Sequence, residues 1–170
     1  MKPGIKAGAA KTLLLLRHAK SSWDDPAIAD FDRPLATRGE RDAPEMGRAL
    51  ALRGPLPQVI VSSPAVRTRE TLGLFLEAAG LKTRPKFEAS LYGASVTDLL
   101  QAVRKLPAAK ACALMVGHNP GLEELVAGLT GVRAEMPTAA LACLELKCAD
   151  WEETGPGAGE LRWLLKPKEL

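Results

Sequence analysis

The two histidines of the chain stand beside residues suited to binding an anion, and each follows a short apolar run. His18 comes directly after Arg17 at the end of one run, and His118 precedes Asn119 after another. A neutral imidazole is a nitrogen nucleophile at physiological pH, since the ordinary pKa of a histidine side chain in water is about 6.5. A guanidinium can donate to two phosphate oxygens at once. These residue types together predict phosphoryl chemistry on a histidine.

A second arginine follows a third apolar run. After that run, Ser63 suits the N-cap of a helix and Pro64 its first position, which places Arg67 about one turn into the helix. Asn119 can cap another helix in the same way. Free N–H groups and a partial positive charge at such helix starts favour a bound anion. A protonated His118 could then hydrogen-bond a phosphoryl oxygen and stabilise the transition state.

The elements that must position these side chains are expected to be strands of one sheet. Residues 12–16, 59–62 and 112–117 are apolar runs bounded by turn residues, which is typical of strands buried on both faces. Residues 65–79 and 96–106 carry apolar side chains at helical spacing. Strands alternating with helices predict an α/β protein, a three-layer α/β/α sandwich with a mostly parallel central sheet. Such sheets bind ligands beyond the carboxyl ends of their strands, where the three motifs stand.

The start of the first helix is ambiguous. Both Thr37 and Asp42 begin a capping-box pattern. Pro44 fits the first turn of a helix capped by Asp42 but would disrupt a helix that begins at Thr37, so we expect a kink or a restart there. Further strands are expected over residues 83–87, 141–147 and 161–166.

Length and charge limit the class of protein. A chain of 170 residues is long enough for one core, so we expect a single domain over residues 12–170. The net charge of +3 comes from Lys2, Lys6 and Lys11, so the rest of the chain is neutral and gives little support for nucleic-acid binding. The first apolar run is too short for a signal peptide or a membrane span. We therefore expect residues 1–11 to be a flexible tail and the protein to be cytoplasmic.

The cysteines do not suggest a disulfide framework or a metal site. Cys112, Cys143 and Cys148 form no CxxC pair and are odd in number. In a reducing compartment they are expected to be buried or half-buried thiols. A zinc site is not expected, because the chain has only two histidines.

Four segments together resemble the histidine phosphatase superfamily, whose members have the phosphoglycerate mutase-like fold. The segments are residues 16–20 (LRHAK), 34–39 (PLATRG), 62–71 (SSPAVRTRET) and 116–121 (VGHNPG). Within the superfamily the chain is most similar to phosphohistidine phosphatases of the SixA type. The resemblance is more specific for the superfamily than for the substrate.

This resemblance implies a mechanism in two steps. His18 would attack phosphorus in line and become a phosphohistidine, and water would then release phosphate. Arg17, Arg67 and His118 would hold the phosphoryl oxygens, with the backbone N–H of Asn119 as a further contact. No metal or other cofactor is implied, since arginines and helix ends supply the positive charge.

A general acid found in many superfamily members has no clear counterpart. The equivalent stretch, residues 88–95, has no carboxylate after Tyr92, and the nearest ones, Glu88 and Asp98, fit surface positions. An absent acid hinders departure of an alkoxide more than of an imidazole, and SixA-type members are likewise described as lacking the acid. The segment between Arg67 and His118 also leaves little room for a lid, which favours a phosphoryl group on a protein surface.

The leading hypothesis is therefore a phosphohistidine phosphatase, with a small phosphorylated substrate as the other possibility. A small-molecule phosphomonoesterase or mutase of the same superfamily is the alternative, and Asp24 of the acid-rich loop 23–32 could then replace the acid. That loop could touch the substrate, or it could be a solvated connection with Trp23 packed on the body. A non-catalytic phosphate-binding module is a third hypothesis, but such a module needs no nucleophile. We expect a monomer or weak dimer that binds neither nucleic acid nor membrane.

Overall fold

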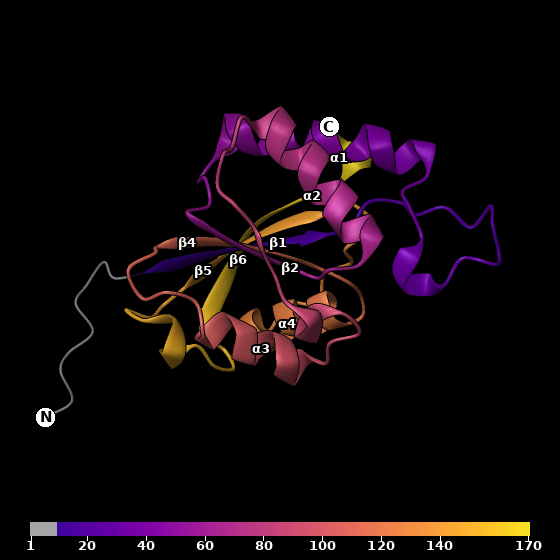
Figure 1. Cartoon of the computed structure of the whole chain (residues 1–170). Helices are drawn as coiled ribbons and strands as arrows, with labels where there is room; N and C mark the ends of the chain where they lie inside the picture. The colour runs from indigo at the N-terminus through magenta and orange to yellow at the C-terminus, as the bar shows by residue number, and fades with distance from the viewer. Residues whose placement is uncertain (1–9) are drawn as a thin grey trace, which may run out of the picture.

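The described strands of the computed structural model, which describes residues 10–170, form one six-stranded sheet (Figure 1). The strands are β1 (Lys11–Arg17), β2 (Val59–Ser62), β3 (Lys86–Phe87), β4 (Cys112–Gly117), β5 (Leu141–Leu146) and β6 (Gly159–Leu165). Their order in the sheet is β3-β2-β4-β1-β5-β6. The pairs β3-β2, β2-β4 and β4-β1 are parallel, whereas β5 is antiparallel to both β1 and β6. The prediction of a mostly parallel sheet is confirmed.

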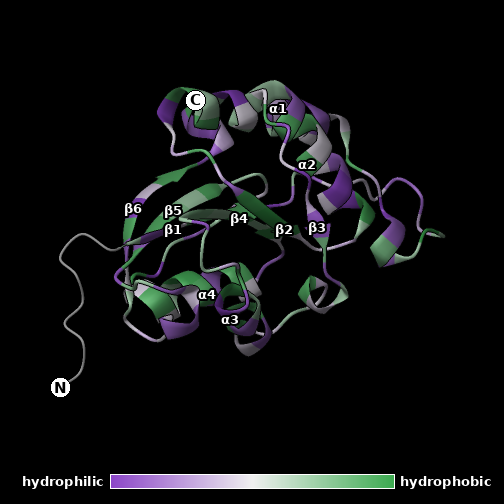
Figure 2. Cartoon of the chain, turned by 60° about the vertical axis from the view of Figure 1, so that its left-hand side comes forward, coloured by the Kyte–Doolittle hydropathy of each residue, from purple (hydrophilic) through white to green (hydrophobic). Residues whose placement is uncertain are grey.

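Helices cover both faces of this sheet (Figures 1 and 2). They are α1 (Thr37–Arg53) and α2 (Val66–Ala79) on one face, and α3 (Val96–Arg104) and α4 (Gly121–Thr130) on the other. Successive side chains of a strand point to opposite faces. In β1, Leu14 and Leu16 accordingly pack into the core beneath α1 and α2, while Leu13 and Leu15 pack into the core beneath α3 and α4. A strand buried on both faces must be apolar throughout, and the predicted three-layer sandwich is confirmed.

The helix α1 runs without interruption through Pro44, so the expected restart at Asp42 is wrong. Pro44 lacks an N–H and removes one hydrogen bond from the helix. Tertiary packing offsets that loss, because Met46 and Leu50 are fully buried and Gly47 lies against the backbone of Phe75. A Cβ at position 47 would come within 2.2 Å of the Phe75 carbonyl oxygen, so the two helices approach closely at this point.

Both helix starts near the predicted site lie later in the chain than expected. The helix α2 begins at Val66 with Ala65 as its N-cap, and α4 begins at Gly121 with Pro120 as its N-cap. Ser63 and Asn119 are therefore not the N-caps of these helices. The predicted strand over residues 83–87 shortens to Lys86–Phe87.

The predicted N-terminal tail ends earlier than expected. Lys11 is the first residue of β1, and its Nζ donates to the carbonyl oxygens of Ala108 and Lys110 at 2.6 and 3.1 Å. The remainder of the predicted tail, residues 1–9, lies outside the described residues. Within residues 10–170, no helix combines the length and the apolar character needed to cross a bilayer.

The cysteines agree with the expectation of buried thiols. Cys112, Cys143 and Cys148 are all free and buried. Burial raises the pKa of Cys112 to about 12 and that of Cys143 to about 11, so these thiols are un-ionised and unreactive at neutral pH.

Candidate active site

The carboxyl ends of β1, β2 and β4 bring the predicted residues to one edge of the sheet. Arg17 is opposite Gly117 in the parallel β1-β4 ladder, and the N–H of His18 donates to the Gly117 carbonyl at 3.1 Å. The rings of His18 and His118 are 5.2 Å apart between centroids. Arg67 reaches the same place from the first turn of α2, where its Nη2 lies 3.3 Å from Nδ1 of His118. We refer to Arg17, His18, Arg67 and His118 as the floor of the site.

His18 is held as one neutral tautomer. Its Nδ1 lies 2.8 Å from the carbonyl oxygen of Ala19, which can only accept, so Nδ1 carries the hydrogen and Nε2 keeps its lone pair. The side chain is almost fully buried, and this burial lowers the pKa of His18 to about 3, helped by the nearby His118 and Arg67. The ring is therefore unprotonated at physiological pH, as a nucleophile requires.

The two arginines of the floor are each anchored at one end and unpaired at the other. In Arg67, Nη1 donates to the Asp30 carbonyl at 2.7 Å and Nη2 lies 3.2 Å from Oδ2 of the same residue. In Arg17, Nη1 donates to the Met136 carbonyl at 3.0 Å. The Nε of each arginine is buried and has no partner within residues 10–170. Buried donors normally have acceptors, so each guanidinium keeps one hydrogen-bond donor without an acceptor in the described chain.

The contacts of His118 fit a neutral ring. Because Arg67 can only donate, Nδ1 of His118 must be an acceptor, and Nε2–H then donates to Oγ of Ser63 at 2.8 Å. Burial and the adjacent Arg67 charge lower the pKa of His118 to about 4. Sequence reasoning assigned Ser63 to a helix cap and missed its contact with this histidine.

The side chain of Asn119 braces the floor from behind. Its Nδ2 donates to Oε1 of Glu123 and to the Met136 carbonyl, both at 2.9 Å. The same Met136 carbonyl accepts from Arg17, so one carbonyl fixes both side chains. The Asn119 backbone N–H forms no hydrogen bond to another residue of the described chain, which leaves it available for the oxyanion contact that the resemblance implies.

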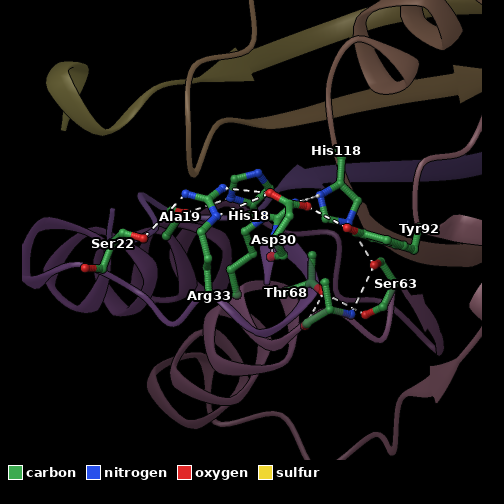
Figure 3. A network of polar contacts seen from close by, with 11 residues as sticks. His18, Ala19, Ser22, Asp30, Arg33, Ser63, Thr68, Tyr92 and His118 are labelled. Atoms are coloured by element: carbon green, nitrogen blue, oxygen red, sulfur yellow. Dashed lines mark hydrogen bonds and ion pairs between the residues drawn. The ribbon is translucent and has the colours of Figure 1, made fainter. Parts of the chain in front are cut away.

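Asp30, Phe31 and Tyr92 lie beside the floor, and we refer to them as the rim. The sequence analysis placed Asp30 in the acid-rich loop that could touch the substrate, but it assigned no role to Phe31 or Tyr92. Tyr92 Oη donates to Oδ2 of Asp30 at 2.6 Å, and the Tyr92 ring lies edge-on to His118, with centroids 5.6 Å apart (Figure 3). The Tyr92 ring also lies edge-on to Phe31, with centroids 5.0 Å apart. Arg33 pairs with Oδ1 of Asp30 at 3.1 Å. The hydrogen bond from Tyr92 and the Arg67 charge lower the pKa of Asp30, which is therefore ionised. An acid-rich loop and the single tyrosine of the chain were the available signals.

The other carboxylates near this stretch have structural roles, as predicted for surface residues. Glu88 pairs with Lys86 at 2.9 Å. Asp98 completes a capping box with Ser95 at the start of α3. Trp23 remains two-thirds exposed but is stacked against the guanidinium of Arg33, at 3.4 Å from the ring centroid.

Contacts behind the floor show how motif segments 34–39 and 62–71, which contain no histidine, support the site. Thr71 Oγ1 accepts from the N–H of Ala19 at 2.9 Å and donates to the Arg67 carbonyl at 2.6 Å, which ties the nucleophile's loop to α2. A Cβ on Gly39 would lie 2.3 Å from the carbonyl oxygen of Lys20, so only glycine allows α1 to approach that loop. Through these contacts, Thr71 and Gly39 position the floor without belonging to it.

Comparisons with known proteins agree with this geometry. The model of the histidine phosphatase superfamily (branch 1) matches residues 13–92. An uncharacterised chloroplastic protein of Arabidopsis thaliana is 38% identical over 172 aligned positions, which cover 93% of this chain and 78% of the other. The structure of a candidate phosphohistidine phosphatase SixA from Nakamurella multipartitia superposes with a TM-score of 0.80 at 30% identity, covering 93% and 96% of the two chains. A protein histidine phosphatase SixA with bound tungstate superposes with a TM-score of 0.81 at 24% identity, covering 93% and 98%.

Proposed function

The chain belongs to the histidine phosphatase superfamily and is a phosphatase, and from this premise we propose that it hydrolyses phosphohistidine through a phosphohistidine intermediate on His18. The observation that carries the proposal is the tautomer of His18. Its Nδ1–H is committed to the Ala19 carbonyl, so the lone pair of Nε2 is free beside two arginines whose Nε atoms lack acceptors within residues 10–170. This arrangement places a nucleophile beside groups that can bind an oxyanion.

In the first step, the guanidinium groups of Arg17 and Arg67 donate to the phosphoryl oxygens. A phosphoryl dianion offsets the burial that lowers the pKa of His118, so His118 takes up a proton and donates from Nδ1. The backbone N–H of Asn119 adds a further contact. A bond forms between Nε2 of His18 and phosphorus while the bond from phosphorus to the substrate nitrogen breaks, and that electron pair leaves with the substrate imidazole.

The hydrogen bond from Nδ1 of His18 to Ala19 also serves the second step. Once Nε2 carries the phosphoryl group, the proton that remains on Nδ1 makes the ring a phosphorylated imidazolium. Its leaving group is then neutral imidazole, which departs readily when water attacks phosphorus. Hydrolysis returns His18 to the tautomer seen in the structure, with phosphate as product.

The carboxylates around the site favour a nitrogen leaving group. An alkoxide needs a proton from a general acid, and such an acid must be protonated at working pH. Glu88 and Asp98 are engaged elsewhere, and Asp30 is kept ionised by its hydrogen-bond donors. When the other ring nitrogen of a phosphohistidine is protonated, its histidine leaves as a neutral imidazole and needs no such acid.

The surroundings of the floor suit a phosphoryl group presented on a protein. Arg17 also lines an open groove of about 920 Å³ that runs between the start of α1 and the C-terminal segment. Charged side chains of both signs line it, including Arg38, Glu45 and Lys168. A groove of this size and mixed charge accommodates polypeptide beside the phosphohistidine.

Turnover of a panel of substrates tests the proposal. We expect hydrolysis of a histidine-phosphorylated protein, and rapid acid-free quenching should trap alkali-stable, acid-labile phosphate on His18. His18→Asn is the matched control and should trap none. Turnover of sugar phosphates or phosphoglycerates alone would instead identify a small-molecule phosphomonoesterase or mutase. Binding of phosphohistidine without any phosphoenzyme would identify a binding module.

A further inference from the structure

We propose that the rim, Asp30, Phe31 and Tyr92, forms a subsite that binds the leaving imidazole of the substrate in its protonated form. This inference rests on the proposed function, because only a nitrogen leaving group offers a ring N–H and a positive charge. It goes beyond that function by assigning the selectivity for the leaving group to side chains outside the floor.

The position of the rim matches that of a leaving group. His18 is 7% exposed and the side chain of Arg67 is 7% exposed, whereas the Asp30 side chain is 52% exposed. In-line displacement places the leaving group on the side of phosphorus opposite Nε2 of His18. Because His18 is buried and Asp30 is half-exposed, we place the leaving group on the exposed side of phosphorus. Asp30 lies on that side, between Arg33 and His118 (Figure 3). Its Oδ2 accepts a hydrogen bond from Nη2 of Arg67, a proposed phosphate ligand.

The charge of the rim suits a cation. Asp30 is the one carboxylate within the described chain that pairs with a floor residue, and the floor itself contributes two guanidinium groups. Its oxygens accept from Tyr92, Arg67 and Arg33, and a protonated carboxyl would lose these charge-assisted bonds. The Asp30 carboxylate partly offsets the positive charge of Arg17, Arg33 and Arg67. Its presence therefore favours a nearby imidazolium, and it disfavours the negative charge that develops on a departing alkoxide.

The shape and hydrogen bonding of the rim suit an imidazole ring. Tyr92 gives its hydroxyl hydrogen to Asp30, so the lone pairs of its oxygen can accept the N–H of the leaving ring. Phe31 is partly exposed and packs edge-on against Tyr92, which leaves aromatic surface for a planar cation. A ring held in this way keeps its proton, and it leaves phosphorus as neutral imidazole when the electron pair of the phosphorus–nitrogen bond moves to it.

Two small substrates that form the same phosphoenzyme separate the rim from the floor. Phosphoimidazole has the proposed leaving group, whereas 4-nitrophenyl phosphate has one that needs no proton. In Asp30→Asn we expect phosphoenzyme formation from phosphoimidazole to slow by about 10-fold to 1,000-fold, because an opposite charge shifts a neighbouring pKa by about 1 to 3 units. Formation from 4-nitrophenyl phosphate should change by less than about 3-fold. Tyr92→Phe should lower the ratio of the phosphoimidazole rate to the 4-nitrophenyl phosphate rate, by a smaller factor than Asp30→Asn does. Asp32→Asn, on the same exposed turn, should leave this ratio unchanged.

The pH dependence of single-turnover phosphoenzyme formation provides a second measurement. The groups that face Asp30 are Arg33 of its own loop, Arg67 of α2, Tyr92 and His118. With phosphoimidazole, the rate should fall as pH rises and the bound ring loses its proton. This fall should move to lower pH in Asp30→Asn, whereas the profile for 4-nitrophenyl phosphate should not move.

The outcomes distinguish the two proposals. Equal slowing of both substrates in Asp30→Asn would show that Asp30 only positions Arg67, and no slowing would show that it has no role; either result overturns the subsite. Failure of the wild type to hydrolyse phosphohistidine and phosphoimidazole, despite a phosphoenzyme formed from 4-nitrophenyl phosphate, would overturn the proposed function as well.

Discussion

The floor of the active site is buried and held mainly by backbone carbonyls, whereas the rim is exposed and held by its own side chains. His18 is fixed by Ala19, and Arg17 by Met136, both through carbonyl oxygens. Asp30 is fixed by Tyr92 and by arginine side chains. The backbone of the sheet thus sets the nucleophile and its anion site. The rim is tied to that frame through the pair between Asp30 and Arg67, but the bond from Tyr92 and the pair with Arg33 lie outside the floor. We therefore expect the floor to determine whether the reaction occurs and the rim which leaving group is accepted.

Removal of the nucleophile should have the largest effect. In His18→Asn we expect kcat to fall by a factor on the order of 10^4 or more, because no covalent intermediate can form. Rapid-quench labelling measures the phosphoenzyme directly, and phosphate binding to the variant shows that the oxyanion site persists. A stable phosphoenzyme in this variant would place the nucleophile elsewhere and break the distinction between floor and rim.

Replacement of a floor arginine should be the next largest change. Arg67→Lys removes the planar fork and the buried Nε donor while keeping the charge, so kcat/KM should fall by about 10^2-fold to 10^3-fold. Both phosphoimidazole and 4-nitrophenyl phosphate should be affected alike, in contrast to the rim variants. Arg69→Lys, at an exposed position of the same helix, is the control and should have near-wild-type kinetics.

The buried histidines should make the floor sensitive to acid. Burial lowers the pKa values of His18 and His118 to about 3 and about 4 from 6.5, so the unfolded chain takes up protons below pH 6.5 that the folded protein does not. The free energy of unfolding therefore falls as pH drops from about 6.5 toward about 4. At pH 5 each histidine should cost about 2 kcal/mol relative to pH 7.5.

Urea unfolding at pH 7.5 and pH 5 measures this loss. His18→Asn and His118→Asn should each reduce the pH-dependent loss by about 2 kcal/mol. Asp30→Asn should not reduce it, because the pKa of Asp30 is lowered from 3.8 and its carboxylate stays ionised over this range. An equal pH dependence in all four proteins would contradict the assignment of neutral, buried histidines.

The contrast between floor and rim also explains what the sequence could and could not predict. His18 and Arg67 sit at fixed offsets from apolar strands, and local rules for strand ends placed them together. The helix starts were misplaced although Ser63 and Asn119 are good caps by type. Oγ of Ser63 accepts from the N–H of Ala65 before α2 begins and contacts His118, whereas Asn119 uses its Nδ2 as a donor to Glu123 and Met136.

The rim could not be predicted because no local pattern joins its parts. Asp30 and Tyr92 are 62 positions apart in the chain, and a hydrogen bond between their side chains joins them. The protonation state of His118 likewise depends on its burial and on the distance to Arg67, which motif spacing does not specify. Similarly, the continuity of α1 through Pro44 depends on packing against α2, a tertiary effect that outweighs the capping signal.

Deletion of one hydroxyl behind the floor and one at the rim should give the smallest effects and compare the two regions directly. Thr71→Val leaves the buried N–H of Ala19 without its acceptor, so the free energy of unfolding should fall by about 1 to 3 kcal/mol. Tyr92→Phe removes a hydrogen bond whose carboxylate partner remains half-exposed to water, so the loss should be below about 1 kcal/mol.

Urea unfolding and kinetics with both substrates should separate these two variants. Thr71→Val loosens the loop whose carbonyl fixes the tautomer of His18, so it should slow phosphoimidazole and 4-nitrophenyl phosphate by the same factor, and Thr71→Ser should restore both rates. Tyr92→Phe should instead alter the ratio of the two rates. A change of ratio in Thr71→Val, or an equal loss of stability in the two variants, would mean that floor and rim are not independent, since one hydroxyl would then act on both.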